Sequence, residues 1–218
     1  MARISAAAQA AGRNLDEIQL IAVSKTWGAE HLREAAAAGI HRFGESYVQE
    51  ALAKIAALSD LASEWHFIGA LQSNKTRAIA ENFAWVHTVD RFDLAERLAN
   101  ARPAAAAPLN VCLQINVSAE ASKRGVAAAD AARLAARVAG LHGIRLRGLM
   151  AIPRPTLDTG EQRGQFRAVR AVFETLKADG FPLDTLSMGM SDDLEAAIAE
   201  GATMVRVGTA LFGSRNAH

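Results

Sequence analysis

The sequence contains a single cysteine, Cys112, so it cannot form an intramolecular disulfide bond or a metal site built on cysteine pairs. Cys112 lies within an apolar run, which indicates a buried thiol, and the lack of disulfide bonds favours a reducing compartment. No apolar stretch is long enough to span a bilayer, and no secretory signal is recognisable. We therefore expect a cytoplasmic protein that has no membrane partner.

The chain also lacks an excess of positive or negative charge. The chain has 24 basic and 23 acidic residues, a formal net charge of +1, which provides no electrostatic reason to bind nucleic acid or an anionic surface. The six histidines show no HExxH or similar spacing, so no metal site is predicted. No GxGxxG motif follows the first predicted strand, which disfavours a dinucleotide-binding domain.

Short apolar runs alternate with helical segments along the chain. The sequence predicts strands at residues 18–25, 41–45, 65–69, 85–89, 109–117, 145–152, 183–188 and 204–207. It predicts helices at residues 4–11, 29–38, 47–58, 75–81, 91–100, 127–138, 161–177 and 192–200. Gly39 is expected to end the second helix as a C-terminal cap, and Asp90 to be the N-cap of the fifth.

Strands that alternate with helices indicate a parallel sheet with right-handed crossovers. About eight such units close most simply into a (β/α)8 TIM-type barrel. We expect one domain, residues 1–218, with a short N-terminal helix. An open doubly wound sheet is the alternative.

A lysine stands at the end of the first predicted strand, where residues 20–25 read LIAVSK. In a barrel of this type the carboxyl ends of the strands face the active site. A lysine in partly apolar surroundings there can lose its proton and form a Schiff base with a carbonyl group. The alternative is that Lys25 extends its ammonium group into solvent.

Two segments near the C-terminus have the composition of anion-binding turns. In SMGMSD, residues 187–192, a glycine permits a tight turn, and the hydroxyl groups of Ser187 and Ser191 adjoin a predicted helix start. In RVGTALFG, residues 206–213, Gly208 and Thr209 provide backbone amides and a hydroxyl group. Either turn alone has an equally good structural explanation. Together, after the seventh and eighth strands, they favour a phosphate site.

A Schiff-base lysine and a phosphate site describe pyridoxal phosphate, and several motifs make the resemblance specific. The chain resembles the pyridoxal phosphate homeostasis protein family, the single-domain relatives of the alanine racemase barrel. The matching stretches are AVSKT (22–26), FGESYVQEA (43–51), WHFIGALQSNK (65–75), HTVD (87–90), INVSAEASKRG (115–125), GLMAIP (148–153), SMGMSDD (187–193) and VRVGTALFG (205–213). They follow the family order over nearly the whole chain.

The resemblance implies a pyridoxal 5'-phosphate site of fold type III. By this resemblance Lys25 would form the Schiff base, and Arg206 would approach the pyridine nitrogen. The phosphate would be held by Ser191, Gly208 and Thr209, with Ser187 and Met188 nearby. The residues at or near the barrel mouth would be His66, Asn74, Met150 and Lys123. Ser46 stands where the family usually has asparagine, so it keeps one hydrogen-bonding group and loses the amide. Ala70 replaces the usual proline.

Several of these residues also have purely structural explanations. Alternation points either Trp65 or His66 inward, and a structural histidine is as good an interpretation as a functional one. Met150 and Met188 fit a core position as well as a cofactor contact. His87 and His142 are interpreted as structural, and Glu120 with Lys123 as a solvated pair. Trp27 is expected to form a wall of the site.

The sequence favours a cofactor carrier over an enzyme. Racemisation by two bases needs an acid or base on each face of the substrate, whereas the chain has one tyrosine, Tyr47, at the start of a predicted helix. An arginine partner for the pyridine nitrogen makes the cofactor a weaker electron sink than an aspartate would. We expect a monomer that exchanges the cofactor with pyridoxal phosphate-dependent apo-enzymes. An amino-acid racemase-like enzyme is the first alternative, and a Schiff-base aldolase is a weaker one.

Overall fold

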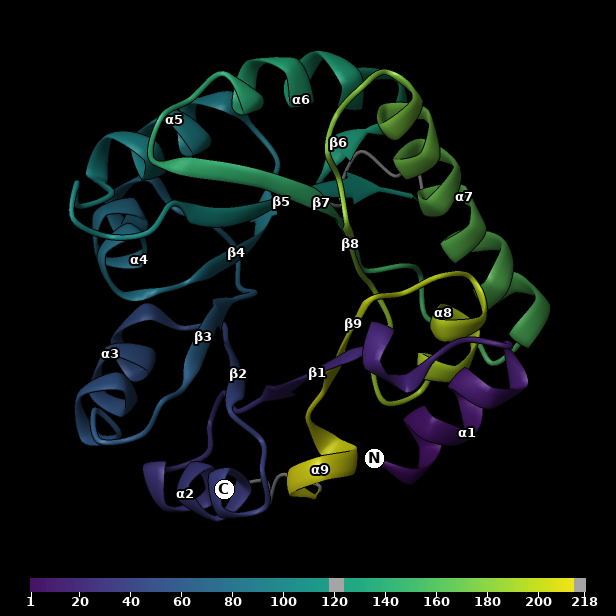
Figure 1. The fold of residues 1–218 in the computed structure, drawn as a ribbon, viewed down its shortest axis with the longest axis horizontal. Helices are drawn as coiled ribbons and strands as arrows, with labels where there is room; N and C mark the ends of the chain where they lie inside the picture. Colours follow the sequence, from purple (N-terminus) through teal and green to yellow (C-terminus); the bar gives the residue numbers. More distant parts are fainter. Residues whose placement is uncertain (118–123, 214–218) are drawn as a thin grey trace.

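Strands pair side by side around a closed ring in the computed structural model, which describes residues 1–117 and 124–213 (Figure 1). The order around the ring is β1-β2-β3-β4-β5-β7-β8-β9, and β9 pairs with β1 to close it. Every pairing in the ring is parallel. These eight strands confirm the predicted (β/α)8 barrel and exclude the open sheet.

The strands are short and the helices lie outside them (Figure 1). The strands are β1 (Gln19–Val23), β2 (Arg42–Glu45), β3 (Glu64–Phe67), β4 (Trp85–Val89), β5 (Leu109–Asn116), β6 (Val126–Ala127), β7 (Ile144–Ala151), β8 (Thr185–Ser187) and β9 (Met204–Val207). The α-helices are α1 (Ala2–Ala10), α2 (Ala29–Ala37), α3 (Val48–Ala57), α4 (Thr76–Asn82), α5 (Phe92–Ala101), α6 (Ala131–Ala139), α7 (Thr159–Ala178), α8 (Leu194–Ala199) and α9 (Thr209–Phe212). Short 3-10 helices occupy Leu15–Glu17, Ser73–Lys75 and Ala128–Asp130, and β6 adds a two-residue pairing beside β5.

Alternation along the strands divides the apolar side chains between two cores. Outward residues such as Phe43 and Phe67 pack beneath the helices in the larger core. Burial of such a side chain stabilises the fold by about 1.5–3 kcal/mol. Inside the barrel lies a smaller cluster of Ile21, Trp85, Cys112, Met150 and Met204. Cys112 is fully buried there, as the sequence predicted.

The helix ends were predicted with mixed success. Gly39 has a φ of 86°, and Ile40 N–H donates to the carbonyl oxygen of Ala35 at 3.0 Å, so the predicted C-terminal cap is confirmed. The prediction that Asp90 is an N-cap was wrong. The extended backbone continues through Arg91, which occupies the N-cap position, and α5 begins only at Phe92.

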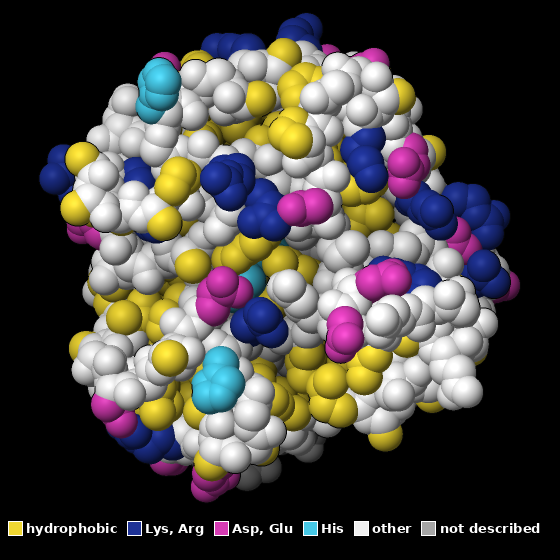
Figure 2. Space-filling view, viewed as in Figure 1, with side chains coloured by type: hydrophobic (Ala, Val, Ile, Leu, Met, Phe, Trp, Pro, Cys, Tyr) yellow, Lys and Arg dark blue, Asp and Glu magenta, His cyan; other side chains and the backbone are white. Residues whose placement is uncertain are grey.

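The surface agrees with the balanced composition. On the face shown in Figure 2, basic and acidic side chains are interspersed rather than gathered into one large area of a single sign. Within residues 1–117 and 124–213, no helix has the length and apolar character needed to cross a membrane.

Candidate functional site

Lys25 lies in the turn that follows β1 and is half-buried. Ile21 belongs to the cluster inside the barrel, and the side chain of Val23 lies against Gly208, where an added Cβ would be 3.4 Å from the Val23 Cβ. Alternate residues of a strand point to the same face, so residue 25 continues the inward-pointing series. Because all strands are parallel, their carboxyl ends meet at one end of the barrel, and Lys25 lies at that end.

The two predicted anion-binding turns lie beside each other and beside the Lys25 turn. The N–H group of Ala210 points at Oγ of Ser191 at 3.5 Å, which joins the turn after β8 to the start of α9. Trp27, two residues after Lys25, stacks on Phe212 of α9 with ring centroids 5.7 Å apart. The structure therefore brings together segments that are almost 190 residues apart in the chain.

At two glycines in these turns a side chain would crowd its neighbours. Gly189 has a φ of 95°, and an added Cβ would lie 2.5 Å from the Cβ of Ala197. At Gly208 an added Cβ would lie 3.2 Å from the carbonyl oxygen of Val23, so a side chain there would crowd the end of β1. Gly208 and Thr209 thus present backbone amides and a hydroxyl group close to the Ser191 turn. Ser191 is half-buried and Thr209 is exposed.

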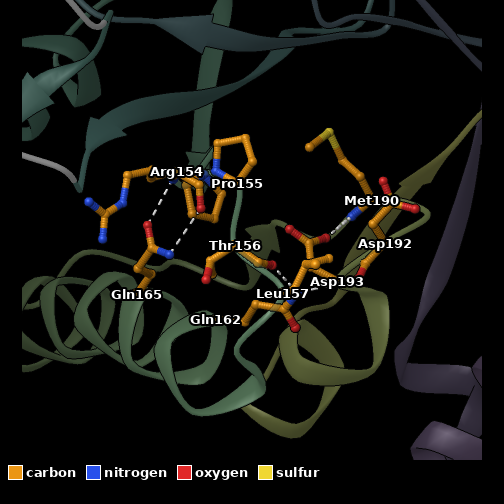
Figure 3. A pocket seen from close by; sticks show the side chains of 10 residues that line it. Arg154, Pro155, Thr156, Leu157, Gln162, Gln165, Met190, Asp192 and Asp193 are labelled. Atoms are coloured by element: carbon orange, nitrogen blue, oxygen red, sulfur yellow. Dashed lines mark hydrogen bonds between the residues drawn. The ribbon is translucent and has the colours of Figure 1, made fainter.

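A pocket adjoins the Ser191 turn. Residues 153–157, which follow β7, line it together with Met190, Asp192 and Asp193, and Figure 3 shows Arg154 and Pro155 on one side and Met190 and Asp192 on the other. The N–H group of Met190 donates to the Asp193 carboxylate at 2.6 Å. The Asp193 side chain therefore bonds within the turn. Helix α8 begins after it, at Leu194, and the predicted start at residue 192 was wrong.

Arg206 is buried in β9 and is 3% exposed. Its guanidinium donates to the Ser187 hydroxyl at 2.8 Å, to the Ser187 carbonyl oxygen at 2.6 Å and to the Ala151 carbonyl oxygen at 2.9 Å. Burial lowers the pKa of Arg206 to about 10, so the group remains a cation at neutral pH. The site therefore holds a fixed positive charge inside the barrel.

A chain of hydrogen bonds runs from Arg206 through the barrel interior. Ser187 Oγ lies 2.7 Å from Nδ1 of His87, whose Nε2 lies 3.0 Å from Nδ1 of His66. His66 Nε2 lies 3.0 Å from a carboxylate oxygen of Glu64. We call these five residues the Arg206–Glu64 chain. It links the cationic side chain on β9 with a carboxylate on β3.

The partners in the Arg206–Glu64 chain determine the direction of every hydrogen bond. The hydrogen bond from His66 lowers the pKa of Glu64, and burial lowers the pKa of both His66 and His87. The carboxylate can only accept, so neutral His66 donates through Nε2 and accepts at Nδ1 from His87. His87 in turn accepts at Nδ1 from the Ser187 hydroxyl, which accepts from Arg206. Each donor then has one acceptor, with both rings neutral.

The other predicted site residues lie in different parts of the barrel, some in its interior and some at its surface. The resemblance placed His66 at or near the mouth. In the structure His66 is fully buried and bonded to Glu64, the residue that begins its own strand, and its contact with the cofactor stays a prediction. Met150 packs inside the barrel, while Met188 belongs to the outer core beneath the helices. Asn74 is exposed in the 3-10 helix after β3, and Ser46 is half-buried directly after β2. Lys123 and Glu120 lie outside the described residues.

The sequence analysis did not single out Glu64 and interpreted His87 as structural, without its partners. The signal that was available is alternation: once Trp65 points outward and His66 inward, Glu64 shares the inward face, and Trp85 and His87 do the same on β4. What alternation does not show is which inward residues meet across the barrel.

Comparisons with known proteins agree with this geometry. A family model described as the N-terminal domain of alanine racemase matches residues 1–216. The chain is 60% identical over 215 residues to the pyridoxal phosphate homeostasis protein of Pseudomonas aeruginosa, covering 99% of this chain and 92% of that relative. It is 53% identical over 217 residues to the protein of the same name from Escherichia coli, covering 98% of this chain and 93% of that relative.

A solved structure gives the same result. The structure of PipY from Synechococcus elongatus with PLP bound has a TM-score of 0.84 and 41% identity, covering 96% of this chain and 100% of that chain. The motifs quoted from the sequence, the barrel and these relatives are in agreement. The chain therefore belongs to the pyridoxal phosphate homeostasis protein family, within the alanine racemase N-terminal domain family.

Proposed function

We propose that this protein binds pyridoxal 5'-phosphate, holds it as a Schiff base on Lys25, and serves in the intracellular homeostasis and carriage of the cofactor. The observation that carries the proposal is the proximity of the Lys25 turn to the paired turns at Ser191 and Gly208, with the buried Arg206 on the neighbouring strand β9. The PipY relative, whose structure holds PLP, supports it.

The residues present fit the three chemical parts of the cofactor. Its aldehyde needs an amine, which Lys25 provides. Its phosphate needs hydroxyl groups and backbone amides, which Ser191, Gly208 and Thr209 offer where the lack of a side chain at Gly208 leaves the backbone open. Its pyridine nitrogen needs a donor, and Arg206 is such a donor. When bound, the cofactor would supply an electrophilic aldehyde and an electron-withdrawing ring.

Two features of this chain support carriage rather than catalysis. The Arg206 guanidinium stays protonated at neutral pH, so it would donate a hydrogen bond to the pyridine nitrogen of the cofactor without transferring its proton. The cofactor ring would then be a weak electron sink. The single tyrosine, Tyr47, is 58% exposed at the N-cap of α3, which makes it a poor second base for racemisation. The relatives carry the name of homeostasis proteins rather than of enzymes.

The covalent bond is tested on the purified protein. Addition of pyridoxal phosphate to the apo-protein should produce an absorbance band near the visible edge that borohydride abolishes, and peptide mass mapping should place the reduced adduct on Lys25. Lys25→Ala should remove the adduct while the barrel stays folded. Lys75→Ala, in the 3-10 helix after β3, is the matched control and should keep it. An adduct that persists in Lys25→Ala would overturn the assignment.

Carriage and catalysis are separated by two further measurements. The loaded protein should transfer its cofactor to a pyridoxal phosphate-dependent apo-enzyme. It should not catalyse the exchange of the α-proton of amino acids for deuterium in heavy water, as followed by NMR. Fast exchange with inversion would support the racemase-like alternative instead. We also propose that the protein acts as a monomer in the cytoplasm, which sedimentation and fractionation test.

A further inference from the structure

We propose that Glu50 and Lys54 of α3 are positioning residues for Lys25, because they hold both peptide groups that flank it. The proposal rests on the proposed function only in taking Lys25 as the residue that bonds the cofactor. Neither residue contributes to the phosphate turns or to the Arg206–Glu64 chain, and both come from a helix on the outside of the barrel.

The contacts lie directly on either side of Lys25. Lys54 Nζ donates a 2.7 Å hydrogen bond to the carbonyl oxygen of Ser24, which belongs to the peptide group before Lys25. The carboxylate of Glu50 accepts a 2.5 Å hydrogen bond from the N–H group of Thr26, which belongs to the peptide group after Lys25. The backbone of the turn is therefore tied to α3 at both ends, while the Lys25 side chain is left to other contacts.

These two side chains belong to a buried ionic cluster. Lys54 Nζ also donates to the carboxylates of Glu45 at 2.7 Å and Glu50 at 2.6 Å, and the Ser24 hydroxyl donates to Glu45 at 2.6 Å. The side chains of Lys54 and Glu45 are 6% and 0% exposed. Hydrogen bonds between charged groups are stronger in such low-dielectric surroundings. The cluster is therefore a rigid support behind the turn.

The turn needs this support because its backbone is strained. Among the described residues other than glycine, Thr26 alone has a positive φ, of 72°. The left-handed region is unfavourable for a β-branched side chain, and such residues persist only where surrounding contacts hold them. Glu50 accepts from the N–H group of this same residue. We conclude that α3, rather than local sequence preference, determines how the backbone at Lys25 leaves the strand.

The consequence is kinetic as well as structural. A nucleophile held in one orientation reacts faster than one that samples several, because less orientational freedom is lost in the reaction. If the cluster only docks α3 onto the barrel, its loss should lower stability and leave the reactivity of Lys25 unchanged. If it positions Lys25, its loss should slow the reaction of that amine in the folded protein.

The experiment compares Glu50→Ala with Glu50→Gln, whose amide oxygen still accepts from Thr26. The Glu50 side chain is 29% exposed, so neither change leaves a deeply buried void. In Glu50→Ala, the second-order rate constant of adduct formation with pyridoxal phosphate should fall by about tenfold. Glu50→Gln should retain most of the wild-type rate. Thr26→Gly, which relieves the strain at φ 72°, should restore part of the rate in the Glu50→Ala background.

A second readout needs no cofactor. The extent of Lys25 modification by an amine-reactive reagent, mapped by mass spectrometry in the folded apo-protein, should change in Glu50→Ala and not in Glu50→Gln. Arg33→Ala is the matched control. It breaks the bonds from α2 to Asp60 and to the carbonyl oxygen of Ala57 at the end of α3, none of which touches a peptide group beside Lys25, and should alter stability alone.

The outcomes are distinct. Wild-type rates and unchanged labelling in Glu50→Ala, with lowered stability, would overturn the positioning role and leave a structural one. If the wild-type protein itself forms no adduct on Lys25, the proposed function fails, while the labelling comparison still tests the positioning role.

Discussion

Arg206 donates two hydrogen bonds to Ser187, one to the hydroxyl oxygen at 2.8 Å and one to the carbonyl oxygen at 2.6 Å. Because the hydroxyl group accepts from Arg206, its own proton is directed to Nδ1 of His87 at 2.7 Å. A single serine therefore connects the buried cation to a buried imidazole.

Replacement of Ser187 by alanine should destabilise the protein by about 1–3 kcal/mol, because it leaves Nδ1 of His87 buried without its donor and removes one acceptor of Arg206. The free energy of unfolding in urea measures the effect. Ser5→Ala, at an exposed position of α1, is the control and should change stability by no more than about 0.5 kcal/mol. Equal values for the two variants would show that the buried bonds contribute nothing.

Replacement of both Ser191 and Thr209 by alanine should weaken binding of pyridoxal phosphate more than Ser46→Ala does. Hydrogen bonds to a charged phosphate are worth about 1.5–3 kcal/mol each, so affinity should fall by at least about tenfold. Ser46 lies after β2, away from the contact between Ser191 and α9. Equilibrium titration of the apo-protein decides the question, and an unchanged affinity in the double variant would remove the phosphate role.

Stability should fall as the pH is lowered from about 6.5, the usual pKa of histidine. Burial lowers the pKa of His66 and His87 in the folded protein, so the unfolded chain binds more protons below that pH and is favoured there. Each histidine contributes a slope of up to about 1.4 kcal/mol per pH unit. In His87→Gln the slope of unfolding free energy against pH should be smaller by up to that amount.

The comparison between variants is needed because Glu45 acts in the opposite direction. Burial raises the pKa of Glu45, so its contribution to stability is present at low pH and decreases as the pH rises above about 4.5, the ordinary pKa of a glutamate side chain. Glu45 is common to all the variants, and its effect cancels in the difference. His142→Gln, at an exposed position, is the matched control. Parallel curves for the wild type and His87→Gln would contradict the buried neutral state of His87.

Cys112 should be inert towards thiol reagents in the native protein. Burial raises the pKa of its thiol to about 12, so almost no thiolate exists at pH 8, and the side chain is fully buried inside the barrel. Labelling with a chromogenic disulfide should be slow in buffer and immediate in concentrated urea. Because the chain has one cysteine, the whole signal belongs to this residue. Immediate labelling of the native protein would show that the barrel interior opens readily.

Much of the barrel could be predicted because its signals are local. Each strand is a short apolar run, and Gly39 ends α2 through its own backbone conformation. The position of Lys25 at the end of the first strand and the glycines of the two predicted anion-binding turns follow from residues next to each other in the chain. Such features depend on the intrinsic preferences of a few residues, which the sequence displays directly.

The tertiary structure alone decided which distant polar groups meet. His87 and Ser187 are separated by 100 positions, and Lys54 reaches Ser24 across 30. Alternation gives the inward or outward face of a residue, but the partner across the barrel depends on strand register, and the partners of Lys54 depend on where α3 lies. The local patterns of the sequence were therefore enough to predict the barrel, the family and the amine at the end of β1. The contacts of buried charged groups with partners far along the chain, such as Lys54 with Ser24 and Arg206 with Ser187 and Ala151, follow only from the closed ring of strands and the helices around it.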